Sequence, residues 1–186
     1  MLRIHIGSIT DTGWNLDEQV EPRLLPLIAD VTRDGSTEFT RLVHARIRAT
    51  LAGESVRLDG RIQTAARLTC SRCLEPFEFI VDADFSATAI PAPPTESDHQ
   101  SPDDIELSAD EMDVITYMGD SIDLRDEVAQ QIIMALPFKP LCRNNCKGLC
   151  SRCGIDLNHQ ACQCHNQNQG SPFAVLKTLN FPTKKD

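Results

Sequence analysis

Aromatic side chains are scarce in this chain of 186 residues, which has a single tryptophan, Trp14, and a single tyrosine, Tyr117. No segment approaches the ~20 consecutive apolar residues that a membrane-spanning helix needs, so we expect no membrane partner. Acidic residues outnumber basic ones, and the formal net charge of −9 argues against binding nucleic acid by charge alone. Hydrophobic residues still make up 41%, so the chain can form a core of one domain, with at most a small appended module.

Catalytic motifs are missing as well. The chain contains no H-E-x-x-H, H-x-E or G-x-S-x-G motif and no glycine-rich phosphate loop. We find no nucleophile beside a base, and a catalytic zinc site would keep three protein ligands and one open position. The sequence therefore predicts a protein that is not an enzyme and takes no small-molecule substrate.

The first ten residues read MLRIHIGSIT, with no long apolar run, no small-residue cleavage site and no excess of arginine and serine. They resemble neither a secretory signal nor a transit peptide. We therefore expect a cytoplasmic protein whose cysteines stay reduced.

Cysteine, by contrast, is abundant, and six of the eight cysteines lie within residues 142–164. A C-x2-C pair followed by glycine is separated by eight residues from a C-x-C pair. Two close pairs joined by a short loop are typical of a four-thiolate zinc site, because each pair turns both sulfurs toward one ion. The predicted ligands of this site are Cys150, Cys153, Cys162 and Cys164.

The remaining cysteines are a C-x2-C pair, Cys70 and Cys73, and a C-x3-C pair, Cys142 and Cys146. We predict that these four meet across the junction of sheet and helix and bind a second zinc ion, which gives two ions per chain. A competing partition places the four cysteines of residues 142–153 on one ion. It leaves Cys70 and Cys73 as free thiols or a redox pair. A content of one zinc ion per chain would support the C-terminal site alone.

Other interpretations of the cysteines stay open at this point. Disulfides would need an oxidising compartment, and an iron–sulfur cluster is also held by thiolates. Residues 142, 146 and 150 could line one face of a helix, although Pro140 and Gly148 disfavour a continuous helix there. His159 and His165 flank the last pair and could replace a thiolate in a mixed site.

Apolar and polar residues alternate between residues 39 and 91, which is the period of a half-buried β-strand. We expect about four antiparallel strands there, with a turn at Gly53 and a hairpin turn at Asp59-Gly60. The segment from Cys70 to Cys73 falls in a later connection. Short strands are also expected over residues 2–6, 105–107 and 114–118.

Residues 121–136 form the clearest helix pattern. Asp123 can cap its start, an apolar stripe includes Val128 and Ile132, and Pro137 ends it. A second short helix is expected over Phe173–Leu179.

These elements predict an α+β fold, in which an antiparallel β meander is packed by one main helix. A C-terminal, cysteine-rich module of the zinc-ribbon or zinc-knuckle kind follows. We expect the domains to be residues 1–138, with an acidic loop at about 91–104, and residues 139–186.

Charge is distributed unevenly along the chain. Residues 139–186 hold seven basic and two acidic residues, a net of +5, so the rest of the chain carries −14. Residues 96–127 alone hold twelve acids against Arg125. The simplest interpretation of the acidic stretch is a solvated surface, but it could also contact a basic protein. The basic segment is compatible with binding to RNA.

Several segments together resemble the YceD family of large ribosomal RNA subunit accumulation proteins. They are C-S-R-C-L-E-P-F at 70–77, I-D-L-R-D-E-V-A-Q-Q-I-I-M-A-L-P at 122–137, P-L-C-R-N-N-C-K-G-L-C-S-R-C-G-I-D-L-N at 140–158 and P-F-A-V-L-K-T-L at 172–179. The resemblance implies a bacterial or plastid protein needed for the synthesis, processing or stability of large-subunit ribosomal RNA. The partner would be ribosomal RNA, a basic large-subunit protein or a pre-ribosomal particle.

An alternative function rests on the Cys70–Cys73 pair alone. An isolated C-x2-C pair would suit a thiol- or zinc-responsive regulatory or interaction module.

Overall fold

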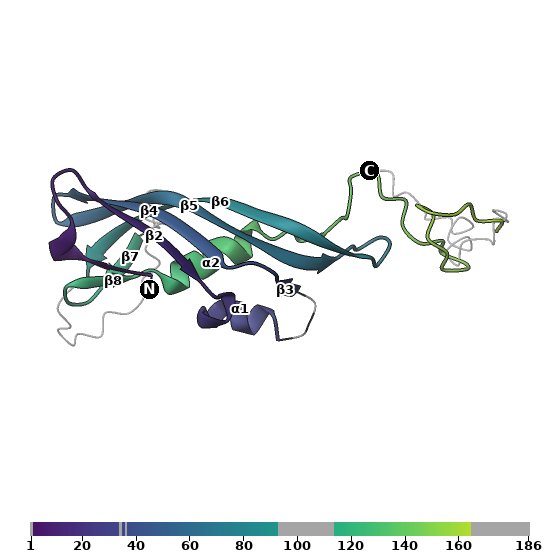
Figure 1. Ribbon diagram of the computed structural model, residues 1–186, viewed down its shortest axis with the longest axis horizontal. Coiled ribbons are helices and arrows are strands. Elements are labelled where there is room, and N and C mark those ends of the chain that lie inside the picture. Colours follow the sequence, from purple (N-terminus) through teal and green to yellow (C-terminus); the bar gives the residue numbers. More distant parts are fainter. Residues whose placement is uncertain (1, 34, 36, 93–113, 165–186) are drawn as a thin grey trace, which may run out of the picture. The chain divides into compact units, whose positions relative to one another are not determined.

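The computed structural model describes residues 2–33, 35, 37–92 and 114–164 (Figure 1). The chain divides into two compact units, Met1–Cys146 and Lys147–Asp186, called here the N-terminal and C-terminal units. The domain division that the sequence predicts, after residue 138, stays a proposal. Among the described residues, no helix is long and apolar enough to cross a membrane.

The described elements all belong to the N-terminal unit. In chain order they are β1 (Arg3–His5), η1 (Ile6–Ser8), β2 (Trp14–Val20), η2 (Pro22–Leu24), α1 (Pro26–Val31), β3 (Thr37–Phe39), β4 (Val43–Ala52), β5 (Ser55–Thr69), β6 (Pro76–Pro91), β7 (Val114–Tyr117), β8 (Ser121–Asp123) and α2 (Arg125–Ala135).

A six-stranded sheet dominates this unit, in the order β2-β4-β5-β6-β7, with β3 also paired to β5. All pairs are antiparallel except β6 with β7, which is parallel. The predicted α+β fold with an antiparallel meander is therefore confirmed. The predicted strand at 105–107 and the predicted helix over Phe173–Leu179 lie outside the described residues.

The predicted hairpin turn at Asp59-Gly60 is wrong. Both residues lie inside β5, and the turn between β4 and β5 falls at Gly53-Glu54 instead. Gly60 is needed for another reason, because a Cβ built on it would lie 2.2 Å from the backbone oxygen of Arg46. The glycine permits a close approach of two strand backbones, as glycines inside strands often do.

One face of the sheet is covered by the helices. Alternate residues of β4 and β5, such as Ile47, Leu58 and Ile62, are buried in the core. Helix α2 packs on β5 and β6 and on α1, and it buries Val128 and Ile132 as its apolar stripe predicts (Figure 1). Leu136 follows in extended conformation, where Pro137 prevents the helix from continuing.

Strand β6 is only partly paired on its second edge. Strand β7 covers residues 88–91 of β6, so the rest of that edge has no partner strand in the described chain. Glu78, Asp82 and Asp84 are exposed on the face of β6 opposite the core. They sit at alternate positions of the strand, as polar residues of a half-buried strand should.

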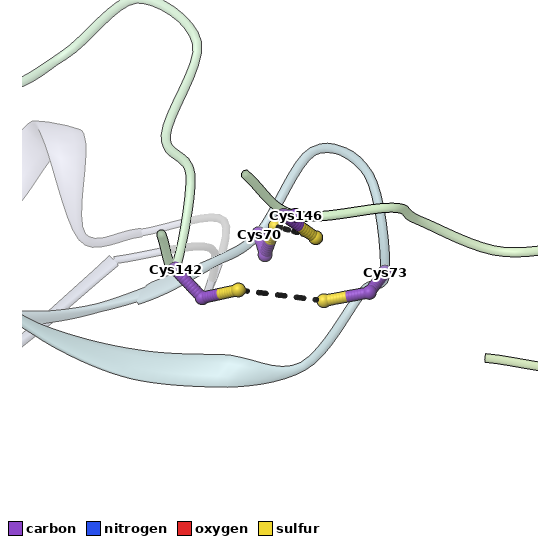
Figure 2. Close-up of side chains that lie close together, drawn as sticks. All are labelled: Cys70, Cys73, Cys142 and Cys146. Carbon is purple, nitrogen blue, oxygen red and sulfur yellow. Dashed lines mark hydrogen bonds between the residues drawn. The ribbon is translucent and has the colours of Figure 1, made fainter. Parts of the chain in front are cut away.

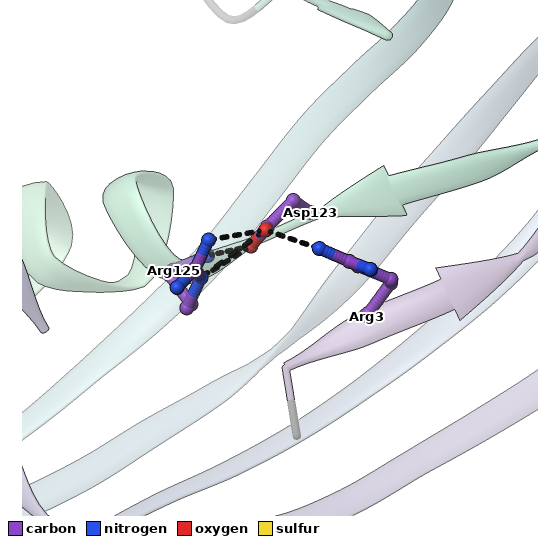
Figure 3. A network of polar contacts seen from close by, with 3 residues as sticks. All are labelled: Arg3, Asp123 and Arg125. Atoms are coloured by element: carbon purple, nitrogen blue, oxygen red, sulfur yellow. Dashed lines mark hydrogen bonds and ion pairs between the residues drawn. The ribbon is translucent and has the colours of Figure 1, made fainter. Parts of the chain in front are cut away.

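Strands β1 and β8 form a separate two-stranded sheet, which leads directly into α2. Asp123 binds an arginine on each side, with its carboxylate 3.2 Å from Arg3 Nη2 and 2.7 Å from Arg125 Nη2 (Figure 3). The same carboxylate accepts the backbone N–H of Arg125 at the helix start. These bonds, chiefly those from Arg125, lower the pKa of Asp123 to about 2.

Candidate metal centres

The first group of cysteines, called here the hairpin cluster, consists of Cys70, Cys73, Cys142 and Cys146. Cys70 and Cys73 occupy the tight turn between the long strands β5 and β6. The Cys70 N–H donates to the carbonyl of Glu75 (2.9 Å), and the Leu74 N–H donates to the carbonyl of Cys70 (2.9 Å). These two bonds fold the C-x2-C segment so that both thiols face the same side.

The other two cysteines of the hairpin cluster arrive from the segment that follows α2. The Ser71 N–H donates to the carbonyl of Pro140 (2.8 Å), and the Arg72 side chain donates to the carbonyl of Cys146 (2.8 Å). Hydrogen bonds thus dock this segment onto the hairpin tip from both ends. The four sulfurs then lie within 4.8 Å of one another (Figure 2).

The spacing of these sulfurs fits a metal ion better than a disulfide. Cys70 Sγ lies 3.8 Å from Cys146 Sγ, and Cys73 Sγ lies 3.7 Å from Cys142 Sγ. Four thiolates at about 2.3 Å from a tetrahedral zinc ion are about 3.8 Å apart, whereas a disulfide brings two sulfurs to about 2.05 Å. The hairpin cluster therefore fits a closed, four-thiolate zinc site, and three of its four cysteines are buried.

The second group, called here the C-terminal cluster, consists of Cys150, Cys153, Cys162 and Cys164. It repeats the turn of the hairpin cluster, with the same residues C-S-R-C. The Cys150 N–H donates to the carbonyl of Ile155 (2.8 Å), and the Gly154 N–H donates to the carbonyl of Cys150 (2.9 Å). Gly154 has a φ of 71°, and Leu74 occupies the matching position of the first turn with a φ of 62°.

The sulfurs of the C-terminal cluster are also within 4.8 Å of one another. Cys162 Sγ lies 3.3 Å from Cys150 Sγ and 3.5 Å from Cys153 Sγ. Backbone N–H groups point at two of the sulfurs, since Arg152 donates to Cys150 and Cys164 donates to Cys162. This cluster is more open than the first, because Cys153 and Cys164 are exposed.

Comparison with known proteins places both clusters within one family. The family model described as "Large ribosomal RNA subunit accumulation protein YceD" matches residues 58–180, which is about two thirds of the chain. The chain belongs to the YceD family. The matched residues include all eight cysteines, so both clusters lie within the part of the chain that the family model covers.

Individual relatives are more distant. An uncharacterized protein of Mycobacterium tuberculosis is 26% identical over 126 residues, which cover 68% of this chain and 56% of the relative. Two relatives are named "Large ribosomal RNA subunit accumulation protein YCED homolog 1, chloroplastic". The one from Arabidopsis thaliana is 24% identical (68% of this chain, 44% of the relative), and the one from Zea mays is 28% identical (61% and 45%). The chain spans about half the length of these relatives, and no solved structure matches it.

The pKa values of the cysteine thiols differ within each cluster of the YceD-family chain. Burial acts to raise the pKa of Cys70, but backbone hydrogen bonds, first that of Cys142, lower it to about 6. The Glu75 backbone acts to lower the pKa of Cys73, but burial and the neighbouring thiols raise it to about 12. Four thiolates this close repel one another, so their joint ionisation requires a cation among them.

In the C-terminal cluster the backbone of Cys153 and that of Arg152 lower the pKa of Cys150 to about 6. The backbone of Cys164 acts to lower the pKa of Cys162, but the three neighbouring thiols raise it to about 12. Each cluster therefore combines one thiol of lowered pKa with two of raised pKa, which are Cys73 and Cys142 in the hairpin cluster and Cys162 and Cys164 in the C-terminal cluster.

The structure groups the sulfurs in the two sets that the sequence proposes as ligands, and Cys142 and Cys146 lie with Cys70 and Cys73. Metal binding by these residues stays a prediction. His159 is not grouped with the sulfurs, since its Nε2 lies 3.7 Å from Asp156 Oδ2 and the ring is largely exposed. His165 lies outside the described residues.

Two features of the YceD-family chain escaped the sequence analysis. The hydrogen bond from Arg72 to the carbonyl of Cys146 joins residues 74 positions apart, and no local pattern predicts it. The left-handed backbone of Leu74 could have been predicted, because Gly154 follows the second C-S-R-C at the same position.

Proposed function

We propose that this chain is a non-enzymatic ribosome-biogenesis factor that supports the synthesis, processing or stability of large-subunit ribosomal RNA. The observation that carries the proposal is its membership of the YceD family across residues 58–180. The names of the two plant relatives refer to accumulation of the large ribosomal RNA subunit, which agrees with such a role. As part of this proposal we place the protein in the bacterial cytoplasm, where ribosomes are assembled.

Each cysteine cluster holds one zinc ion in this proposal, and the ions stabilise the fold. The sulfur spacing supports zinc most directly in the hairpin cluster, where distances of 3.8 and 3.7 Å match the edge of a tetrahedral four-thiolate site. In the C-terminal cluster the sulfurs gather at 3.3 and 3.5 Å, somewhat closer than that edge. A closed site of this kind leaves no position for a catalytic water.

Native mass spectrometry of protein purified under reducing conditions tests the metal content. Two zinc ions per chain are expected, and Cys73→Ser and Cys150→Ser should each lose one. The matched control variants Ser71→Ala and Ser151→Ala keep all eight thiols and should keep both ions. A chain that carries no metal while both clusters remain folded would contradict the zinc assignment.

The direct partner is ribosomal RNA or a basic large-subunit protein within a pre-ribosomal particle. The net charge of +5 over residues 139–186 supports a contact with RNA, although four thiolates on one Zn²⁺ carry −2 and cancel part of it. The acidic residues of segment 96–127 support a contact with a basic protein.

A pull-down of the native protein from its own cells tests the role itself. Precursor large-subunit particles should be recovered, and cells that lack the gene should hold less large-subunit than small-subunit ribosomal RNA. Recovery of neither large-subunit RNA nor its proteins, with unchanged RNA levels in the deletion strain, would reject the proposal.

A thiol- or zinc-responsive module is the second candidate function. The exposure of Cys153 and Cys164 favours it for the C-terminal cluster, whereas Cys70 and Cys73 are buried. Thiol titration of the metal-loaded native protein separates the two functions. Reactive thiols before any chelator is added would favour the responsive module, and none would favour two closed structural sites.

A further inference from the structure

The six-stranded sheet has an open position at the corner where β2 ends. Strands β3 and β4 pair in line with the same edge of β5, since Phe39 opposes Ala66 and His44 opposes Gln63. Strand β2 covers β4 as far as the pair Val20–Val43 and then stops. Pro22 turns the chain into η2 and α1, so no described strand lies beside β3.

Among the described residues, β3 pairs with β5 alone, which leaves its outer side without a strand. The Thr40 N–H donates to the carbonyl of Ala65 (2.8 Å), so the polar groups of Thr40 point toward β5. Because successive residues of a strand direct these groups to opposite edges, those of Phe39 and Thr37 point away from β5. A strand placed there would be hydrogen-bonded by groups that the described chain does not use.

A groove of about 760 Å³ lies along this edge, between β3 and α1. Its walls include Pro22, Ile28, Ala29, Phe39 and Leu42. Leu42 is 48% exposed although it is a large apolar side chain. The groove thus offers apolar contacts on its walls and backbone hydrogen bonds along one side.

The charges at the rim of the groove are already neutralised. Arg41 is paired with Glu78 (3.0 Å) and Glu38 with Arg67 (2.8 Å), and Arg23 is paired with Glu21. A phosphate backbone would find no surplus of positive charge here. An uncharged peptide in extended conformation can make both apolar contacts with the walls of the groove and backbone hydrogen bonds with β3.

We propose that an extended peptide segment of a partner protein binds in this groove as an additional strand beside β3. Its backbone pairs with the outward groups of Thr37 and Phe39, and every second side chain, apolar, packs against α1. The groove lies outside the matched family region, and the proposal rests neither on the ribosomal role nor on metal binding.

Selection from a phage-displayed library of random peptides of about ten residues, against the full metal-loaded chain, tests this proposal. Enriched peptides should alternate apolar and polar residues. One enriched peptide, made synthetically with a fluorophore, then gives a Kd by anisotropy. Hydrogen exchange of the Phe39 amide should slow when that peptide binds.

Two variants locate the binding. Thr37→Pro removes an outward N–H without touching the ladder to β5, and it should weaken binding by about tenfold, the value of one hydrogen bond. The matched variant Thr37→Val keeps the N–H and should bind as the wild type does. Ala29→Arg fills the groove from an exposed position of α1, so it should abolish binding without unfolding the chain.

Several results would overturn the proposal. They are the absence of enriched peptides, equal binding to the Ala29→Arg variant, or displacement of the peptide by single-stranded RNA. A Phe39 amide already protected in the monomer, or protected only by self-association, would show that this chain covers its own edge.

Discussion

Removing the two thiols that follow α2 should destabilise the N-terminal unit strongly if the hairpin cluster holds a metal. The double variant Cys142→Ser, Cys146→Ser keeps nearly the same side-chain volume but leaves nothing to tie this segment to the hairpin tip through an ion. Cys70 and Cys146 are 76 residues apart. A cross-link that closes such a loop contributes about 4.5 kcal/mol at 25 °C in the chain-entropy model.

The unfolding free energy can be measured with guanidinium chloride and the fluorescence of Trp14, which lies half-buried on β2. The double variant should lose about 4.5 kcal/mol relative to the metal-loaded wild type. A chelator should bring the wild type down to the level of the variant and leave the variant unchanged.

The C-terminal cluster supplies the control for this experiment. Cys162→Ser, Cys164→Ser opens a loop of 12 residues in the other unit, so the unfolding reported by Trp14 should stay the same. If the hairpin variant unfolds at the same denaturant concentration as the wild type, metal closure of the hairpin cluster is refuted. An equal loss with and without chelator would refute it too, because the loss would then come from serine packing.

Three further predictions concern the scaffold around the sites. Gly60→Ala should lower the free energy of unfolding by about 3 kcal/mol, because the added Cβ would force β4 and β5 apart. The control Gly7→Ala meets no atom within 4 Å and should change the free energy of unfolding by less than about 0.5 kcal/mol. Equal losses for the two variants in denaturant titrations would contradict the prediction. The lowered pKa of Asp123 adds to the stability of the fold at pH values above 3.8, the ordinary pKa of this group, and the contribution is lost as the pH falls through about 2. Asp123→Asn should therefore flatten the curve of stability against pH in that range. An unchanged slope would contradict the arginine contacts. Leu74→Gly should stabilise the N-terminal unit by about 0.5 kcal/mol, because the leucine side chain is mostly exposed and glycine adopts the left-handed backbone without strain. A lower melting temperature of the variant would show instead that the Leu74 side chain makes contacts that favour the folded state.

The sequence predicts those features of the chain that local periodicity determines. The apolar stripe with Val128 and Ile132 specifies the helix and the face that it buries. Alternation specifies the long strand β6 and the part of β5 that follows Gly60. The spacing of the cysteines is enough to propose the C-terminal set, but it leaves two partitions open for Cys142 and Cys146. The helix stripe, the strand period and the C-terminal cysteine set are determined by residues close in sequence, whereas the hairpin cluster joins cysteines as far as 76 residues apart.

The features that the sequence analysis got wrong or did not foresee depend on distant partners. Asp59-Gly60 has the composition of a hairpin turn, and only the backbone of Arg46 across the sheet shows why a glycine is needed inside a strand. The residues of β7 indicate a strand but not its parallel direction, which depends on the path of the chain after β6. The docking of residues 140–146 onto the hairpin tip likewise rests on Arg72, which a local reading treats as one more polar turn residue.

Beyond the four residues that pair with β7, the second edge of β6 has no partner strand in the described chain. A long strand with unpaired backbone groups can recruit the same strand of another molecule and begin an aggregate. Glu78 and Asp82 are held in ion pairs with Arg41 and Arg61, and Asp84 is also exposed, so another molecule's strand would meet charged side chains along β6. Charged side chains along an edge strand disfavour the pairing of one copy of a chain with another, and β6 has this arrangement.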